Sequence, residues 1–264
     1  MSALDDVRAV LVDLDGVLYV EDEPVAGAAE AVRALRDAGL GLRFVTNTTQ
    51  RSRRHTLAKL DRLGFAAAPG ELITPATLAV EHCRARGYEH VAMLMADDVK
   101  EDLAGLTEAE ERVDAVIVGD LGERFDYAVL NRAFRMLLDG AELVALQRNR
   151  YWRRADGLSL DVGPFVAALE YAAGVEAVVV GKPAAAFFLL ALSQLGAEPP
   201  HAAMVGDDVE SDVAGAMRAG LRGVLVRTGK FREDTAAATD PPPTATIDSI
   251  ADLPSLLGLV SGAR

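Results

Sequence analysis

Short apolar runs alternate along most of the chain with segments of helical spacing. Between the first two runs, Ala28, Val32 and Leu35 share one helical face, and Gly39 can end that helix in a left-handed conformation. This alternation is typical of βαβ units, so we predict an α/β protein with a mainly parallel sheet. The runs expected to form strands are AVLVDLD, LRFVT, HVAMLM, DAVIVG, LVALQ, AVVVG, AAMVGD and GVLVRT.

Proline and glycine mark several element boundaries. Thr74 followed by Pro75 predicts an N-cap and a first-turn proline, and Gly163-Pro164 predicts a similar helix start. Another helix is expected to begin near Arg51. The segment 235–246, TAAATDPPPTAT, contains three consecutive prolines, so we expect a surface connection to a last strand and helix there.

Composition narrows the classes of function. A net charge of −13 over 264 residues argues against nonspecific binding to nucleic acid or to anionic membranes. No apolar run approaches the length of a membrane span, and the acidic N-terminal residues do not resemble a signal peptide, so a cytoplasmic location is expected. Cys83 is the only cysteine, and we interpret it as a packed helix residue.

Four predicted strands end in polar residues that could carry chemistry. In open parallel sheets, ligands bind beyond the carboxyl ends of the strands, so these segments are expected to meet at one crevice. The four segments are Asp13-Leu14-Asp15-Gly16, Thr46-Asn47-Thr48-Thr49, Gly181-Lys182-Pro183, and Gly206-Asp207-Asp208 with Asp212 five residues after Asp207.

The residue types at these strand ends indicate phosphate chemistry. Two carboxylates as close as Asp13 and Asp15 repel each other unless a cation compensates, and Mg2+ prefers a few carboxylates together with water and phosphate oxygens. Lys182 would add a fixed positive charge, and the Thr46 hydroxyl with nearby backbone N–H groups could donate to phosphoryl oxygens.

The four segments, in this order, resemble the four motifs of the haloacid dehalogenase superfamily of aspartate-nucleophile phosphatases. The matching stretches are DLDGVLY, VTNTT, VVVGKP and MVGDDVESDVAGA. Further stretches, among them LNRAFRMLLDGA, GPFVAALEYA and VRTGKF, are most similar to the NagD-like group and its phospholysine phosphohistidine inorganic pyrophosphate phosphatase branch. The resemblance covers the whole chain and implies a Rossmann-like parallel-sheet core with an inserted α/β cap domain.

The resemblance also implies a role for each matching residue. Asp13 would be the nucleophile and Asp15 the general acid and then base, while Lys182 would support catalysis and bind phosphate together with Thr46 and Asn47. Mg2+ would be held by the Asp13 side chain, the backbone carbonyl of Asp15 and the Asp207 side chain. Asp208 and Asp212 would act through waters or orient the ligands.

The implied domain boundaries place residues 1–78 and 180–264 in the catalytic core and residues 79–179 in the cap. The cap is expected to close over the crevice and select a small phosphorylated substrate. In its segment 147–165 we expect Arg148, Tyr151 or Trp152 to face that substrate, although a surface hairpin or a subunit contact is an equal alternative. The resemblance also allows a homodimer formed through the cap.

Several alternatives stay open from the residues alone. Thr46 and Asn47 could cap the following helix, and Lys182 could be a solvated lysine. Asp208 and Asp212 could have no role in the site, because aspartates are common in the first turn of a helix, where their negative charge is favourable. Within the enzyme class, the resemblance permits phosphate esters, phosphoramidates and pyrophosphate as substrates, and we place the ester first. A receiver-type signalling domain and a non-catalytic module that binds phosphorylated ligands are the alternatives from other classes.

Overall fold

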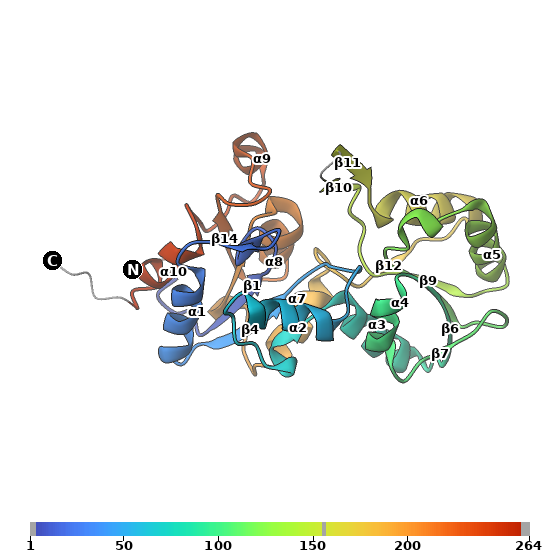
Figure 1. The fold of residues 1–264 in the computed structure, drawn as a ribbon, viewed down its shortest axis with the longest axis horizontal. Helices are drawn as coiled ribbons and strands as arrows, with labels where there is room; N and C mark the ends of the chain where they lie inside the picture. The colour runs from blue at the N-terminus through green and yellow to red at the C-terminus, as the bar shows by residue number, and fades with distance from the viewer. Residues whose placement is uncertain (1–3, 155–156, 260–264) are drawn as a thin grey trace. The chain divides into compact units, whose positions relative to one another are not determined.

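The computed structural model describes residues 4–154 and 157–259, which divide into two compact units (Figure 1). The first unit contains the described parts of Met1–Thr46, Leu57–Ile73 and Lys182–Arg264, and the second contains those of Asn47–Thr56 and Thr74–Gly181. Compared with the predicted cap, 79–179, the second unit begins at Thr74 and ends at Gly181, and it also takes in residues 47–56. Two hydrogen bonds explain the placement of residues 47–56, because the backbone N–H groups of Ser52 and Arg53 donate to the carboxylates of Asp98 and Asp102 at 2.8 and 2.7 Å.

The first unit is built on a parallel sheet in which six described strands have the order β15-β14-β13-β1-β4-β5. The central strand β1 pairs with β13 on one side and with β4 on the other, and Asp13 lies opposite Val45. The strands are β1 (Ala9–Asp13), β4 (Gly41–Val45), β5 (Leu72–Ile73), β13 (Ala202–Gly206), β14 (Arg222–Val226) and β15 (Ala245–Ile247).

Helices cover this sheet on both faces. Val10 and Val12 of β1 pack in one cluster with α1, so the pleat turns Leu11 and Asp13 to the opposite face. On the first face α1 packs against α10 (Figure 1). On the opposite face Val213 of the π-helical turn and Met217 of α8 pack with Leu225 of β14, and α7 packs against α8. The helices are α1 (Ala28–Asp37), α2 (Arg53–Arg62, shared with the second unit), α7 (Ala185–Ser193), a π-helical turn (Val209–Ala214), α8 (Gly215–Arg218), α9 (Glu233–Ala238) and α10 (Leu253–Leu256).

The second unit has its own parallel sheet, with the described strands in the order β12-β9-β8-β6-β7. Its core joins Val116 and Val118 of β8 to Ala133 of α5 and Val166 of α6. Its strands are β6 (His90–Leu94), β7 (Thr107–Glu108), β8 (Ala115–Val118), β9 (Glu142–Ala145) and β12 (Val178–Val179), and its helices are α3 (Pro75–Arg86), α4 (Asp97–Lys100), α5 (Tyr127–Leu138) and α6 (Val162–Ala173).

Two antiparallel hairpins accompany the sheets. One, β2 (Tyr19–Val20) with β3 (Glu23–Pro24), follows the first strand of the first unit. The other, β10 (Tyr151–Arg154) with β11 (Gly157–Leu160), forms from part of the segment 147–165, in which the substrate-facing residues of the cap were expected. This outcome matches the surface-hairpin alternative, since Tyr151, Leu158 and Leu160 are all more than half exposed.

All eight predicted strands are present, and the predicted start of α3 after Thr74 is confirmed. The start predicted at Gly163-Pro164 is wrong by two residues. Helix α6 begins at Val162 because the Asp161 carboxylate accepts a hydrogen bond from the Val162 backbone N–H at 2.8 Å and so caps the helix. The helix expected near Arg51 begins at Arg53, and four residues of the predicted proline-rich connection, 235–238, extend α9.

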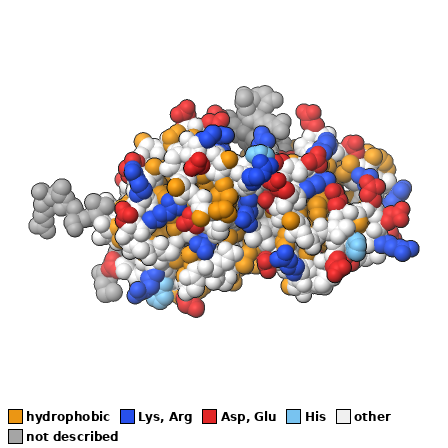
Figure 2. Space-filling view, turned by 60° about the horizontal axis from the view of Figure 1, so that its bottom comes forward, with side chains coloured by type: hydrophobic (Ala, Val, Ile, Leu, Met, Phe, Trp, Pro, Cys, Tyr) orange, Lys and Arg blue, Asp and Glu red, His pale blue; other side chains and the backbone are white. Residues whose placement is uncertain are grey.

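The surface and the helices bear on the question of membranes. None of the helices in the described ranges combines the length and the apolar character that crossing a membrane requires. On the face drawn in Figure 2, acidic and basic side chains are interspersed with apolar and neutral ones.

Candidate active site

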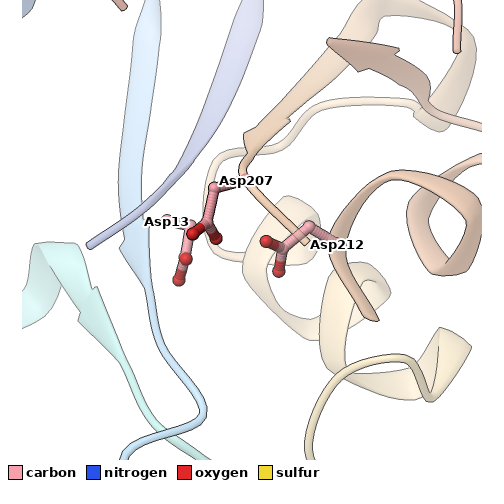
Figure 3. Close-up of side chains that lie close together, drawn as sticks. All are labelled: Asp13, Asp207 and Asp212. Carbon is pink, nitrogen blue, oxygen red and sulfur yellow. The ribbon is translucent and has the colours of Figure 1, made fainter. Parts of the chain in front are cut away.

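Three aspartates of the first unit come together at the carboxyl ends of neighbouring strands. Asp13 is the last residue of β1, Asp207 directly follows β13, and Asp212 lies in the π-helical turn after it. Carboxylate oxygens of the three residues lie within 4.8 Å of one another, and each residue is buried. Figure 3 shows Asp212 directed toward the other two side chains. The structure therefore brings together the first and fourth of the predicted strand ends, those of Asp13 and of Asp207 with Asp212.

Lys182 lies inside this cluster. Its ammonium nitrogen is 2.6 Å from Asp13 Oδ1 and 2.6 Å from Asp212 Oδ1, and only 2% of the residue is exposed. The alternative of a solvated lysine is therefore wrong. The two buried carboxylates raise the pKa of Lys182 despite the opposing effect of burial, so the side chain stays charged.

One lysine does not neutralise three buried carboxylates. Burial, together with the charges of Asp13 and Asp212, raises the pKa of Asp207 to about 8. Burial and the charge of Asp13 raise the pKa of Asp212 to about 7, although Lys182 acts in the opposite direction. Burial also raises the pKa of Asp13, which Lys182 again opposes. The cluster therefore holds an excess of negative charge that a cation or protons must compensate.

The carboxylate oxygens of this cluster fit a small divalent cation. The cluster offers hard carboxylate oxygens at spacings that one ion can bridge, and such an ion would offset the burial and the mutual repulsion that raise the pKa values of Asp207 and Asp212. The sequence predicted Asp13 and Asp207 as side-chain ligands and placed Asp212 further from the ion. The structure puts the Asp212 carboxylate within the same group of oxygens. The Asp15 side chain is outside it, and the ligand predicted from that residue is its backbone carbonyl.

Asp15 lies two residues beyond Asp13, and its side chain reaches solvent. Even so, desolvation by the surrounding protein raises the pKa of this carboxyl group above its ordinary value, against the charges of Lys59 and Lys230. The Tyr19 hydroxyl donates to Asp15 Oδ2 over a long distance of 3.5 Å. An accessible carboxyl group with a raised pKa keeps its proton to a higher pH than an ordinary aspartate, which suits a group that first gives and then takes a proton.

Thr46 and Asn47 fall on different units. Thr46 is buried, directly follows β4, and belongs to the first unit, like Asp13, whose strand pairs with β4. Asn47 belongs to the second unit, where its side-chain oxygen lies close to Gly181. The phosphate-binding role of both residues stays a prediction.

Asp208 has a structural function that the sequence left as an alternative. Its carboxylate accepts hydrogen bonds from the backbone N–H groups of Glu210 and Ser211 at 3.1 and 3.0 Å, so it caps the π-helical turn. Its own backbone N–H donates to Asp212 Oδ2 at 3.2 Å. The Asp208 backbone thus contacts Asp212, and the role that the resemblance implies for these two residues stays a prediction.

Sequence reasoning missed the residues that follow β14. The Lys230 backbone N–H donates to Asp207 Oδ2 at 2.7 Å, and the Thr228 hydroxyl donates to the Gly16 carbonyl oxygen. The strand GVLVRT was predicted, and its end carries Thr-Gly-Lys. The criterion that selected the other four strand ends would therefore have selected this one.

The cap residues predicted to face substrate are placed as follows. Arg148 forms an exposed ion pair with Glu170 of α6 at 2.6 Å, and Tyr151 is 54% exposed on β10. The side chain of Trp152 lies outside the described residues. Contact of these residues with substrate stays a prediction.

We expect Mg2+ to stabilise the protein more at about pH 8 than at about pH 6. A carboxyl group whose pKa is higher in the folded than in the unfolded state binds more protons when folded. The metal-free protein therefore loses stability as the pH rises from about 4 through the pKa values of Asp212 and Asp207. Mg2+ neutralises the same carboxylates and competes with protons. The measurement is the difference in Tm between MgCl2 and EDTA, and an equal difference at both pH values would contradict the prediction.

Comparison with known proteins adds independent information. A family model described as haloacid dehalogenase-like hydrolase matches residues 10–107, and one described as HAD-hydrolase-like matches residues 179–253. The human haloacid dehalogenase-like hydrolase domain-containing protein 2 is 45% identical over 249 residues, which cover 94% of this chain and 95% of that protein.

Two further relatives carry more specific names. Phospholysine phosphohistidine inorganic pyrophosphate phosphatase of Xenopus laevis is 43% identical over 235 residues, which cover 86% of this chain and 85% of that protein. The crystal structure of a glycerol phosphate phosphatase from Mycobacterium tuberculosis in complex with magnesium has a TM-score of 0.85 and 29% identity, covering 96% of this chain and 78% of that one.

Proposed function

Because this chain belongs to the haloacid dehalogenase-like hydrolases, we propose that it is a phosphatase that hydrolyses esters of small phosphorylated molecules with Asp13 as the nucleophile. The observation that carries the proposal is the buried cluster in which Lys182 binds Asp13 and Asp212 at 2.6 Å. The names of the relatives support the reaction class, since they include a pyrophosphate phosphatase and a glycerol phosphate phosphatase. Family membership also argues against the receiver-type alternative.

The first step of the proposed reaction is attack by Asp13. Lys182 donates to Oδ1 of this residue, which leaves Oδ2 to form the bond to phosphorus. The bond between phosphorus and the leaving oxygen breaks, and Asp15 gives its proton to that oxygen. The products of this step are the free alcohol and a phosphoryl group on Asp13.

The second step regenerates the enzyme. The ionised Asp15 carboxylate takes a proton from a water molecule, which attacks phosphorus and releases inorganic phosphate and the Asp13 carboxylate. The Thr46 hydroxyl and Lys182 would bind the phosphoryl oxygens during both steps. Asp13, Asp207 and the Asp15 carbonyl would hold Mg2+, with Asp212 beside them, and the ion would reduce the repulsion between carboxylate and phosphate.

Phosphoramidates and pyrophosphate are the second candidate substrate class. The 43% identity to a phospholysine phosphohistidine inorganic pyrophosphate phosphatase favours them. The chemistry is the same, except that Asp15 would protonate a nitrogen or a phosphate oxygen. Selection of the substrate by the second unit stays a prediction, as does a dimer formed through it.

We expect the purified protein to hydrolyse para-nitrophenyl phosphate with MgCl2 and not with EDTA, and Asp15→Asn to lower kcat about 100- to 10,000-fold. Asparagine keeps the size of the side chain but can neither give nor take the proton. The measurement is release of nitrophenolate, followed by a panel of phosphorylated metabolites with phosphohistidine and pyrophosphate included. Absence of turnover by the wild type on every substrate would instead support a non-catalytic module that binds phosphorylated ligands.

A further inference from the structure

The segment Thr228–Lys230 joins three parts of the site that are far apart in the sequence. It directly follows β14, and its residues bind both the loop after β1 and the aspartate after β13. The Thr228 hydroxyl donates to the carbonyl oxygen of Gly16, and the Lys230 backbone N–H donates to Asp207 Oδ2 at 2.7 Å. In each of these hydrogen bonds one partner is a backbone atom and the other is a side-chain atom. The two bonds therefore fix the main chain as well as the side chains.

Two glycines, Gly16 and Gly229, lie against Asp207 Oδ2, and the oxygen fits there because neither residue has a side chain. A Cβ atom at Gly229 would lie 2.0 Å from Asp207 Oδ2 and 2.6 Å from the Gly16 Cα, and a Cβ atom at Gly16 would also lie 2.0 Å from that oxygen. Both glycines have a positive φ, +63° and +83°. A side chain at either position would have to displace the Asp207 carboxylate, which is only 2% exposed and has little room to move.

We propose that Thr228–Lys230 is a positioning segment for the cation ligand Asp207. The segment holds Oδ2 by the Lys230 N–H and leaves Oδ1 to bind the cation. Through Thr228 it also fixes the backbone next to Asp15, whose carbonyl is the predicted third ligand. The inference rests on the proposed use of a divalent cation. It adds a fifth strand end to the four that carry the site.

The contacts explain why such a segment is needed. The Lys230 N–H gives Asp207 Oδ2 a fixed partner, so the orientation of the carboxylate does not depend on the cation alone. A hydrogen bond from a backbone N–H to a carboxylate is charge-assisted. Mutation of residues that orient metal ligands typically lowers the metal affinity about 10- to 100-fold. The Lys230 side chain is exposed, and the group that donates to Asp207 Oδ2 is the backbone N–H of this residue.

The test compares two glycine substitutions by isothermal titration calorimetry with MgCl2. Gly229→Ala is expected to bind Mg2+ about 10- to 100-fold more weakly than the wild type, because its methyl group displaces the Asp207 carboxylate. The control is Gly196→Ala. Gly196 has nearly the same backbone strain, with φ +61° against +63°, but no atom within 4 Å of a Cβ placed there. It should therefore bind Mg2+ like the wild type.

A second pair of variants keeps the test decisive if Gly229→Ala does not fold. Thr228→Val has nearly the same shape as the wild type but lacks the hydroxyl that binds Gly16, so we expect weaker Mg2+ binding with an unchanged far-UV circular dichroism spectrum. Thr228→Ser retains the hydroxyl and should restore the affinity. A purely structural contribution would lower the stability of Thr228→Val and leave its Mg2+ affinity unchanged.

The outcomes separate this inference from the proposed function. Wild-type affinity in Gly229→Ala or, if that variant does not fold, in Thr228→Val would overturn the positioning role and leave the phosphatase proposal intact. Failure of the wild type itself to bind Mg2+ would contradict the proposed function and the inference with it. Weaker binding in Gly229→Ala and Thr228→Val, with normal binding in Gly196→Ala and Thr228→Ser, supports the inference.

Discussion

Asp13→Asn is expected to lower phosphatase activity by about four orders of magnitude or more while leaving the protein folded. The amide is nearly the same size as the carboxylate, but it does not attack phosphorus and so forms no covalent intermediate. Lys182 keeps its contact with Asp212 in this variant, and one of three repelling charges is removed. The measurement is kcat with para-nitrophenyl phosphate, together with Tm in EDTA, which should be no lower than that of the wild type.

The matched control for this variant is Asp37→Asn, the same chemical change at an exposed residue at the end of α1. It should leave both kcat and Tm unchanged. Retention of more than a few per cent of wild-type activity in Asp13→Asn, with Asp37→Asn normal, would mean that another group attacks phosphorus. The proposed reaction would then be wrong even if the family and the fold stand.

Lys182→Met should reduce the free energy of unfolding by about 3–5 kcal/mol in EDTA, and activity should also be lost. The methionine fills much of the same space, but Asp13 and Asp212 then lack the ammonium group that each binds at 2.6 Å. Removing one partner from a buried ion pair costs more than the pair contributes, because the remaining charges stay buried without compensation. Urea unfolding followed by circular dichroism measures the effect.

Two further variants identify the cause of that loss. Lys100→Met removes an ammonium group that pairs with Asp97 and Glu108 at the surface, and we expect it to cost less than about 1 kcal/mol. The double variant Lys182→Met with Asp13→Asn should recover part of the lost stability, because it has one fewer uncompensated carboxylate. No recovery would show that lost packing, not unpaired charge, destabilises Lys182→Met.

The strands and most of the site were predictable because each depends on a local pattern. A continuous apolar run indicates a strand buried on both faces, and polar residues directly after it lie at the carboxyl end whatever the rest of the chain does. Asp13 and Asp207 were found in this way. Lys182 was found as well, although its burial among two carboxylates was not visible from its neighbours in sequence.

The parts that could not be predicted depend on contacts between distant segments. The start of α6 was misplaced because Gly163-Pro164 is a strong local signal, whereas the actual cap, Asp161, is itself held by Gln147 from fourteen residues earlier. The position of residues 47–56 within the second unit depends likewise on Asp98 and Asp102, about fifty residues later in the chain.

By itself, the sequence determined the α/β class, the strand order along the chain and the residue types that a phosphatase site needs, because apolar periodicity and strand-end polarity are properties of short segments. Only the tertiary structure decided that Asp212 joins Asp13 and Asp207 in one cluster and that Lys182 lies buried between two of them. It also decided that Thr228–Lys230 holds Asp207. Charge compensation and steric room depend on which atoms come within a few ångströms, and folding alone brings these segments together.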